Sequence, residues 1–198
     1  MTPLIFAINL GKTDVARTLI EAGADLNATD DMKRTPLINS LETENIEIAK
    51  LLIKSGADVN KPSKFGEVPL IEAIRLNDIE IIQMLIQFGA DVDGVDQFDR
   101  TPLMAAATVG NIEIFRILLD AGAKFDAKNN DYFLKAIEGE NIEIIKYMLE
   151  NGADVHATDE FNRTSLALRQ YKLEEAGQST DLIENDEIII MLKSHGAE

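Results

Sequence analysis

The strongest constraint on the fold of this chain is a pattern that recurs every 33 residues. Gly-Ala pairs follow one another at intervals of 33, 33, 33, 30 and 44 residues, and they begin at Gly23, Gly56, Gly89, Gly122, Gly152 and Gly196. A Thr-Pro-Leu tripeptide or a variant of it keeps the same register, with first residues Thr2, Thr35, Val68, Thr101 and Thr164. A fixed period of this length is typical of an array in which each unit is one small supersecondary element.

Within one period the sequence predicts two short helices joined by a tight turn, and then an extended loop. Thr followed by Pro favours the start of the first helix, because Thr supplies an acceptor and Pro lacks only a donor that is unsatisfied there. The second helix begins with an acid that complements the helix dipole, and it continues with apolar residues spaced three and four apart. A Gly then ends it in a left-handed cap. One such pair cannot bury its own apolar faces, so it must stack on neighbours.

Three segments make the chain resemble the ankyrin-repeat family. They are Thr-Pro-Leu at the first helix, an Asn-Ile-Glu-Ile run at the second, and Gly-Ala-Asp-Val-Asn at its end, as in 56–60. The resemblance covers essentially the whole chain in six units, at about residues 1–30, 31–63, 64–96, 97–129, 130–159 and 160–198. It implies an all-α ankyrin-repeat α-solenoid, a single array of stacked helix-turn-helix units with projecting β-hairpin-like fingers and a concave protein-binding face. It implies no reaction.

The sequence departs from the family pattern in three ways. The His that usually follows Thr-Pro-Leu is replaced by a side chain that we expect to pack in the core, at Ile5, Ile38, Ile71, Met104, Leu134 and Ala167. The fifth unit is three residues short, so the finger before it should be stunted. The last unit carries an insertion at about 169–184, which predicts a longer helical hairpin that caps the array.

An apolar patch is expected at the end of the array. The second-helix position that should face water is polar in the first five units, at Arg17, Lys50, Gln83, Arg116 and Lys146. In the last unit it is Ile190, with Ile183 seven residues earlier. Two explanations remain open, since terminal repeats need an adapted outer face. Either the insertion covers this patch, or another chain does, which would make the protein an assembly subunit or a homodimer.

Composition narrows the class of partner. The 35 acidic and 19 basic side chains give a net charge of −16, which argues against nucleic acid and anionic membranes and favours a basic protein partner. The absence of cysteine excludes disulfides and thiolate chemistry. Apolar runs end after about ten residues, short of the ~20 that span a bilayer, and no signal-peptide pattern is found. We therefore expect a soluble, cytoplasmic monomer.

Catalytic chemistry is not indicated. Gly11-Lys12-Thr13 ends like a phosphate-binding loop, but Phe6 stands where that motif needs a glycine. His156 and His195 have neither a Cys nor a second His at ligand spacing, and both are interpreted as surface residues. The carboxylates recur in every unit, which is typical of a scaffold. We expect no enzyme activity, no metal and no cofactor.

The candidate partner-binding residues are those that the repeat leaves free. The finger tips carry large apolar side chains, namely Met32, Phe65, Phe98 and Phe161. Beside them lie Arg34, Glu67, Arg100 and Arg163, and further along the first helix Asn39, Glu72 and Lys135 share a position whose chemistry varies too freely for a core residue. Aromatic side chains surrounded by residues of both charges are typical of a protein-binding hot spot. Alternatively, each ring folds back over a finger. The sequence thus predicts a protein-protein interaction module, such as an inhibitor or adaptor of a basic partner.

Overall fold

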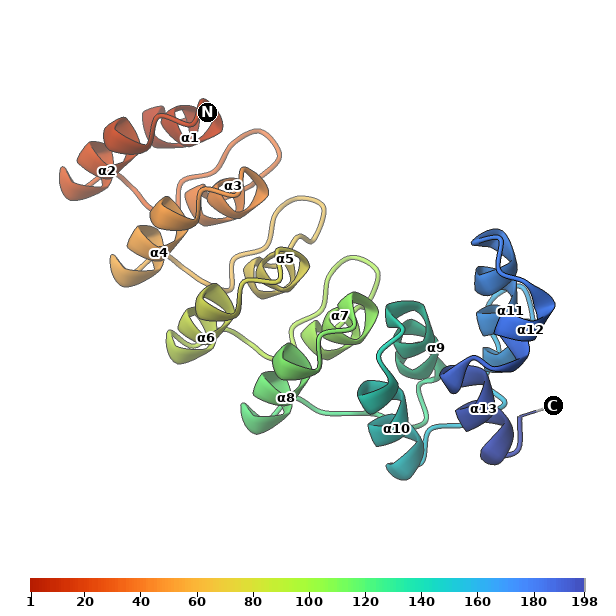
Figure 1. Ribbon diagram of the computed structural model, residues 1–198. Coiled ribbons are helices and arrows are strands. Elements are labelled where there is room, and N and C mark those ends of the chain that lie inside the picture. The colour runs from red at the N-terminus through yellow and green to blue at the C-terminus, as the bar shows by residue number, and fades with distance from the viewer. Residues whose placement is uncertain (198) are drawn as a thin grey trace. The chain divides into compact units, whose positions relative to one another are not determined.

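The chain is almost entirely helical in the computed structural model, which describes residues 1–197 with the side chain of Asp181 excepted (Figure 1). The helices of these residues are α1 (Pro3–Asn9), α2 (Thr13–Glu21), α3 (Pro36–Glu42), α4 (Ile46–Lys54), α5 (Pro69–Arg75), α6 (Ile79–Gln87), α7 (Pro102–Val109), α8 (Ile112–Asp120), α9 (Asn130–Gly139), α10 (Ile142–Glu150), α11 (Ser165–Glu175), α12 (Thr180–Glu184) and α13 (Glu187–Ser194). An antiparallel bridge between Thr158 and Thr164 is the one β-type pairing among the described residues. The all-α fold predicted from the sequence is confirmed.

The chain divides into two compact units, and each is described by itself. Unit 1 holds Met1–Pro102 and Ile117–Ala123, and unit 2 holds Leu103–Arg116 and the chain from Lys124. In unit 1 the first helices α1, α3 and α5 pack in succession, and so do the second helices α2, α4 and α6 (Figure 1). In unit 2, α9 packs on α10 and on α11, and α11 packs on α13. The helix pair is therefore the building block, as its short apolar faces require.

Helix starts and ends follow the predicted local chemistry. The Oγ1 atoms of Thr2, Thr35 and Thr164 each accept a hydrogen bond from the backbone N–H three residues later, which satisfies a donor that the helix cannot. The glycines of the Gly-Ala pairs all adopt a positive φ, from 83° at Gly23 to 97° at Gly196. They end the second helices in the left-handed conformation that glycine adopts without steric strain.

The apolar side chains that replace the family's usual His lie in the core, as predicted. Five of them are buried, namely Ile5, Ile38, Ile71, Met104 and Leu134, while Ala167 is half-buried. The second helices add isoleucines with no exposed surface, namely Ile48 and Ile81 in unit 1 and Ile114 and Ile144 in unit 2. Burial of these faces between successive pairs supplies the apolar area that a single pair cannot.

The insertion and the deletion both have the expected local effect. The insertion extends α11 to 11 residues and adds the short helix α12. Arg169 of α11 anchors this hairpin, because its guanidinium donates to the Asp186 carboxylate at 2.8 and 3.1 Å and pairs with Glu140 Oε1 at 2.8 Å. The finger before α9 shrinks to a turn in which Asn129 N donates to Asp126 O.

The apolar patch near the C-terminus is only partly covered. Ile183 is half-buried, whereas Ile190 of α13 is 52 % exposed and Leu182 of α12 is 60 % exposed. The expectation that the insertion covers the whole patch is therefore wrong for Ile190. The physical reason is that α12 has five residues and packs beside α13, leaving the outer side of α13 open.

Candidate protein-binding site

The long fingers share one hairpin geometry, which holds each tip residue at the turn. In the finger before α3, Asp30 N donates to Arg34 O at 3.1 Å and Lys33 N donates to Asp30 O at 2.9 Å. The same pair of bonds recurs in the fingers that end at Glu67, Arg100 and Arg163. The residue after each tip adopts a positive φ of 56–70°, at Lys33, Gly66, Asp99 and Asn162. The turn closes in one way each time, so the tips project in equivalent positions.

A short polar side chain fastens every one of these hairpins. Asp30 Oδ1 accepts hydrogen bonds from Met32 N and Arg34 N, both at 2.9 Å, and Asp96, Asp159 and Ser63 make the equivalent bonds. Burial alone would raise the pKa of Asp30, but the hydrogen bonds that Arg34 donates to its carboxylate lower this pKa below the ordinary value. These residues were not among those predicted from the sequence. Three of the four fingers carry a signal for them, an Asp four residues before an Arg, whereas the second finger has Ser63 four residues before Glu67.

The tip side chains are exposed, so the alternative that each ring folds back over a finger holds only in part. Their exposed fractions are 43 % for Met32, 44 % for Phe65, 66 % for Phe98 and 70 % for Phe161. Arg100 lies 5.1 Å from the ring centre of Phe98, and Arg163 lies 5.1 Å from that of Phe161. These cation-π contacts orient the rings while leaving much of each ring accessible.

The predicted arginines brace the fingers. Arg34, Arg100 and Arg163 each pair with the Asp four residues earlier, at 3.0, 2.6 and 2.7 Å. In unit 2, Arg163 also lies 5.0 Å from the ring centre of Tyr171, so the last finger is joined to the insertion. Each guanidinium thereby fixes the tip beside it and has less freedom to reach a distant partner.

Two of the predicted binding residues belong to the interior. Asn39 is 1 % exposed and donates from Nδ2 to Thr35 O at 3.0 Å, and Glu72 is 8 % exposed. The expectation that this position lies outside the core is wrong for both. The reason is that α3 packs on α1 and α5 packs on α3, which covers this side of each first helix. The equivalent Lys135 is half-buried and pairs with Glu138 at 2.8 Å.

An acidic cluster, formed by Glu42, Glu67 and Glu72, lies near the finger bases of unit 1. A cavity of about 460 Å³ opens beside it, lined by Arg34, Leu41, Glu42, Glu44, Glu72, Arg75 and Leu76. Burial raises the pKa of Glu42 and of Glu72 above the ordinary value, and the nearby Glu67 carboxylate raises both further. Arg34 lowers the pKa of Glu42 and Arg75 lowers that of Glu72, but these effects are smaller than that of burial. Glu67 Oε2 is buried and accepts no hydrogen bond from the described residues. Arg34 pairs with Glu42 at 2.7 Å and Arg75 pairs with Glu72 at 2.5 Å, whereas Glu67 adds a third carboxylate to the cluster.

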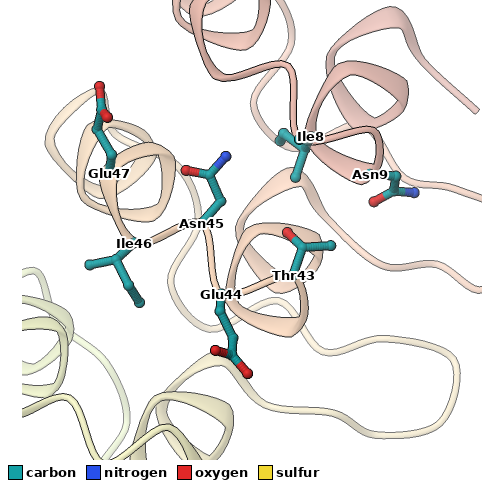
Figure 2. Close-up of a pocket in the computed structure, with 8 residues that line it drawn as sticks. Ile8, Asn9, Thr43, Glu44, Asn45, Ile46 and Glu47 are labelled. Carbon is teal, nitrogen blue, oxygen red and sulfur yellow. The ribbon is translucent and has the colours of Figure 1, made fainter.

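A second cavity, of about 530 Å³, lies where the turns of the first two repeats meet (Figure 2). Asn45 organises it, because Nδ2 donates to Thr13 Oγ1 at 3.1 Å and Oδ1 caps α4 by accepting from Ile48 N. Glu44 and Glu47 also line the cavity, and Figure 2 shows their carboxylates pointing in different directions. They do not form the facing pair that acid-base chemistry uses.

Neighbouring fingers of unit 1 touch one another. Lys64 N donates to Met32 O at 2.8 Å, which links the first two fingers. A Cβ on Gly66 would lie 2.7 Å from Gln97 N, so the second and third fingers are also in close contact. Unit 1 thus brings together the tips Met32, Phe65 and Phe98, the braces Arg34 and Arg100, and Glu67 and Glu72. Lys135, Phe161 and Arg163 lie in unit 2.

Metal clusters, the two histidines and membrane spans were also checked among the described residues. No group of three or more His, Cys, Asp or Glu side chains in residues 1–197 could hold a metal ion. His156 and His195 are exposed, in keeping with their interpretation as surface residues. No described helix is both long enough and apolar enough to cross a membrane.

The fold and this surface define a class of protein in which stacked helix pairs present a row of braced loops. A family model described as "Ankyrin repeats (3 copies)" matches residues 1–63 and 70–159, and a second one described as "Ankyrin repeats (many copies)" matches residues 42–86. The chain belongs to the ankyrin-repeat family. Members of this family are in general protein-protein interaction modules and typically have no enzymatic activity. No curated protein matches the chain.

Proposed function

We propose that this protein binds a basic partner protein through the finger tips of unit 1 and the acidic cluster behind them, and acts as an inhibitor or adaptor of that partner. The observation that carries the proposal is that Phe65 and Phe98 are exposed on fixed hairpins, in which Ser63 Oγ accepts a hydrogen bond from Phe65 N and Asp96 Oδ1 accepts one from Phe98 N. Fixed, exposed aromatic side chains bind without a large entropy loss, which is characteristic of interface anchors.

The partner's chemistry follows from charge. The chain carries a net charge of −16, and Glu67 of the acidic cluster follows the tip residue Phe65 by two positions. A Lys or Arg of a partner could relieve the repulsion between Glu42, Glu67 and Glu72 while its neighbours cover the Phe rings. Charge complementarity of this kind mainly accelerates association and selects the partner, and it weakens as salt rises.

The experiment compares proteins captured from the native lysate by the wild type and by a Phe65→Ala/Phe98→Ala variant. Phe88→Ala is the matched control, because Phe88 is 45 % exposed, close to the 44 % of Phe65, and lies at the end of α6 away from the tips. A partner that binds through the finger tips should be captured by the wild type and by Phe88→Ala, but not by the double variant. Equal capture by all three would refute the location.

A second candidate is an assembly role through the C-terminal apolar patch, as a structural subunit or homodimer. The observation that favours it is the exposure of Ile190 and Leu182, which leaves apolar surface on α12 and α13. Light scattering over a range of concentrations tests it, with Ile190→Lys as the variant. A monomer at all concentrations contradicts assembly, and monomer is the state we propose.

We also expect a cytoplasmic location, which cell fractionation would test.

A further inference from the structure

The fifth repeat differs from the others in the residue that ends its second helix. The residue before each Gly-Ala pair occupies this position, and the six residues are Ala22, Ser55, Phe88, Ala121, Asn151 and His195. Asn151-Gly152 is the one Asn-Gly pair in the whole chain. Both of its residues are exposed, so water reaches them. A side-chain amide and an unhindered backbone nitrogen are thereby adjacent at this helix end.

An Asn-Gly pair can lose ammonia without an enzyme. Gly152 N attacks Cγ of Asn151 and gives up its proton, the Cγ–Nδ2 bond breaks, and Nδ2 leaves with that proton as ammonia. The product is a five-membered succinimide ring. Water then opens the ring at Cγ, which gives aspartate, or at the backbone carbonyl, which gives isoaspartate with one additional carbon in the main chain. Glycine favours the attack, because it has no Cβ and its backbone is the least restricted.

Hydrogen bonds at the end of α10 hold both reacting groups. Gly152 N, the attacking atom, donates to Leu149 O at 3.1 Å. Asn151 Nδ2, the leaving group, donates to Tyr147 O at 2.7 Å. The reaction requires both bonds to break, which happens when the last turn of α10 opens. Helix ends open more readily than helix interiors, so the rate of deamidation should follow the opening of this turn.

Either product would weaken the same helix end. Aspartate has no Nδ2 donor, so Tyr147 O loses its side-chain partner, and the new carboxylate directly follows Glu150 at the negative end of the α10 dipole. Isoaspartate also lengthens the main chain just before Gly152, whose φ of 92° allows Ala153 N to donate to Met148 O at 2.9 Å. The capping pattern of α10 depends on that spacing.

The loop that follows, residues 152–157, connects this helix end to the last repeat within unit 2. Val155 and Ala157 of the loop are buried. Val155 O accepts a hydrogen bond from Ser165 Oγ at 2.5 Å, and Ala157 O accepts one from Ser165 N at 3.1 Å. Because Ser165 is the first residue of α11, the loop holds the start of that helix.

We propose that Asn151 is a site of spontaneous deamidation, at which reaction with water frees the end of α10 and loosens the hold of loop 152–157 on α11. The change is slow and adds one negative charge to unit 2. It does not depend on what the finger tips bind.

The first experiment follows the full chain during storage at mildly alkaline pH. Peptide mass mapping measures the conversion of amide to acid at each Asn, and an isoaspartate assay detects the second product. Asn151 should convert at least about tenfold faster than Asn162, which is also exposed but is followed by Arg163. Asn151→Ser is the matched control, because Ser55 occupies this position in the second repeat, and it should form no isoaspartate at the end of α10. Conversion of Asn151 no faster than that of Asn162 would overturn the proposal.

The same measurement on the chain unfolded in urea tests the role of the helix end. Asn151 should convert about tenfold or more faster in urea, because both hydrogen bonds are then absent. Conversion in urea with none in the folded chain would also overturn the proposal, since the fold would then protect the site completely. Equal rates in the two states would mean that the bonds of Asn151 Nδ2 and Gly152 N do not control the reaction, which contradicts the mechanism.

Asn151→Asp imitates the aspartate product and tests its effect on the fold. Hydrogen exchange should become about two- to fivefold faster in the last turn of α10 and in the first turn of α11. The uncharged Asn151→Ser should change exchange less. Exchange rates equal to those of the fresh wild type, both in Asn151→Asp and in the stored chain that contains isoaspartate, would show that the modification loosens nothing.

Discussion

Removing the Arg169 side chain should loosen the last repeat without unfolding unit 1. Arg169 is 6 % exposed and its guanidinium joins α11 to Asp186, which also caps α13 by accepting from Ile188 N and Ile189 N. In Arg169→Met the Asp186 carboxylate keeps its backbone donors and loses its cation. Breaking a buried pair costs 3–5 kcal/mol, and because the Asp186 side chain is 15 % exposed we expect about 2–3 kcal/mol.

Hydrogen exchange of the α13 amides is the assay, since terminal repeats open locally. A loss of about 2 kcal/mol corresponds to roughly 30-fold faster exchange in α13. Asp186→Asn is the matched control, because Asn caps a helix about as well as Asp and lacks only the charge. It leaves the guanidinium of Arg169, whose side chain is 8 % exposed, with Glu140 as its carboxylate, so it should also lose protection, and the double variant should show coupling between the two positions. Wild-type exchange rates in Arg169→Met would refute the anchoring role.

The pH dependence of the same contact has a defined sign. Although burial opposes the change, the hydrogen bonds from Arg169 and from the α13 backbone lower the pKa of Asp186 in the folded state. The folded state therefore binds the proton less well than the unfolded state does. The stabilisation is complete above the ordinary Asp pKa and is lost as the pH falls through the lowered value. Protection of α13 in the wild type should follow this course, and in Asp186→Asn it should not.

Three further predictions concern single positions. Gly139→Ala should destabilise unit 2 by about 3 kcal/mol or more in urea unfolding, because a Cβ would lie 1.9 Å from Ala107 O; an unchanged midpoint would contradict this close approach. Lys12→Asn should stabilise α2 by about 1 kcal/mol in thermal unfolding, because Lys12 is a cap without a side-chain bond where Asn45 caps α4, and Asn45→Lys should do the reverse. Glu72→Gln should raise the free energy of unfolding at neutral pH, because burial raises the pKa of Glu72 and makes its charged form costly, and it should weaken binding of a basic partner. For the same reason the wild type should become more stable as the pH falls from neutral toward the ordinary Glu pKa, and a less stable variant at neutral pH would contradict this sign.

The sequence predicted the fold because one local pattern is repeated in register. Each Thr cap and each left-handed Gly is dictated by chemistry within a few residues, and the spacing of the Ile residues alone marks the apolar face of each second helix. The tips Phe65 and Phe98 could be found for the same reason, since a fixed offset from Thr-Pro-Leu places them on hairpins.

Burial between repeats could not be predicted as well. Asn39 and Glu72 vary in chemistry like surface residues, yet they are covered because each first helix packs on the preceding one. A single repeat does not reveal which side of a helix faces its neighbour. The uncovered Ile190 has a similar explanation, because the path of α12 beside α13 depends on the anchor between Arg169 and Asp186.

The most direct test of the account is the affinity of the captured partner for three forms of the protein. The exposed fractions of Phe65 and Phe98, 44 % and 66 %, together offer about one whole Phe side chain to an interface. Burying that surface is worth ~1.5–3 kcal/mol, so Phe65→Ala/Phe98→Ala should raise the Kd by about 10- to 150-fold, while Phe88→Ala should leave it within about threefold. A double variant that binds as tightly as the wild type would contradict the claim that the finger tips are the docking site.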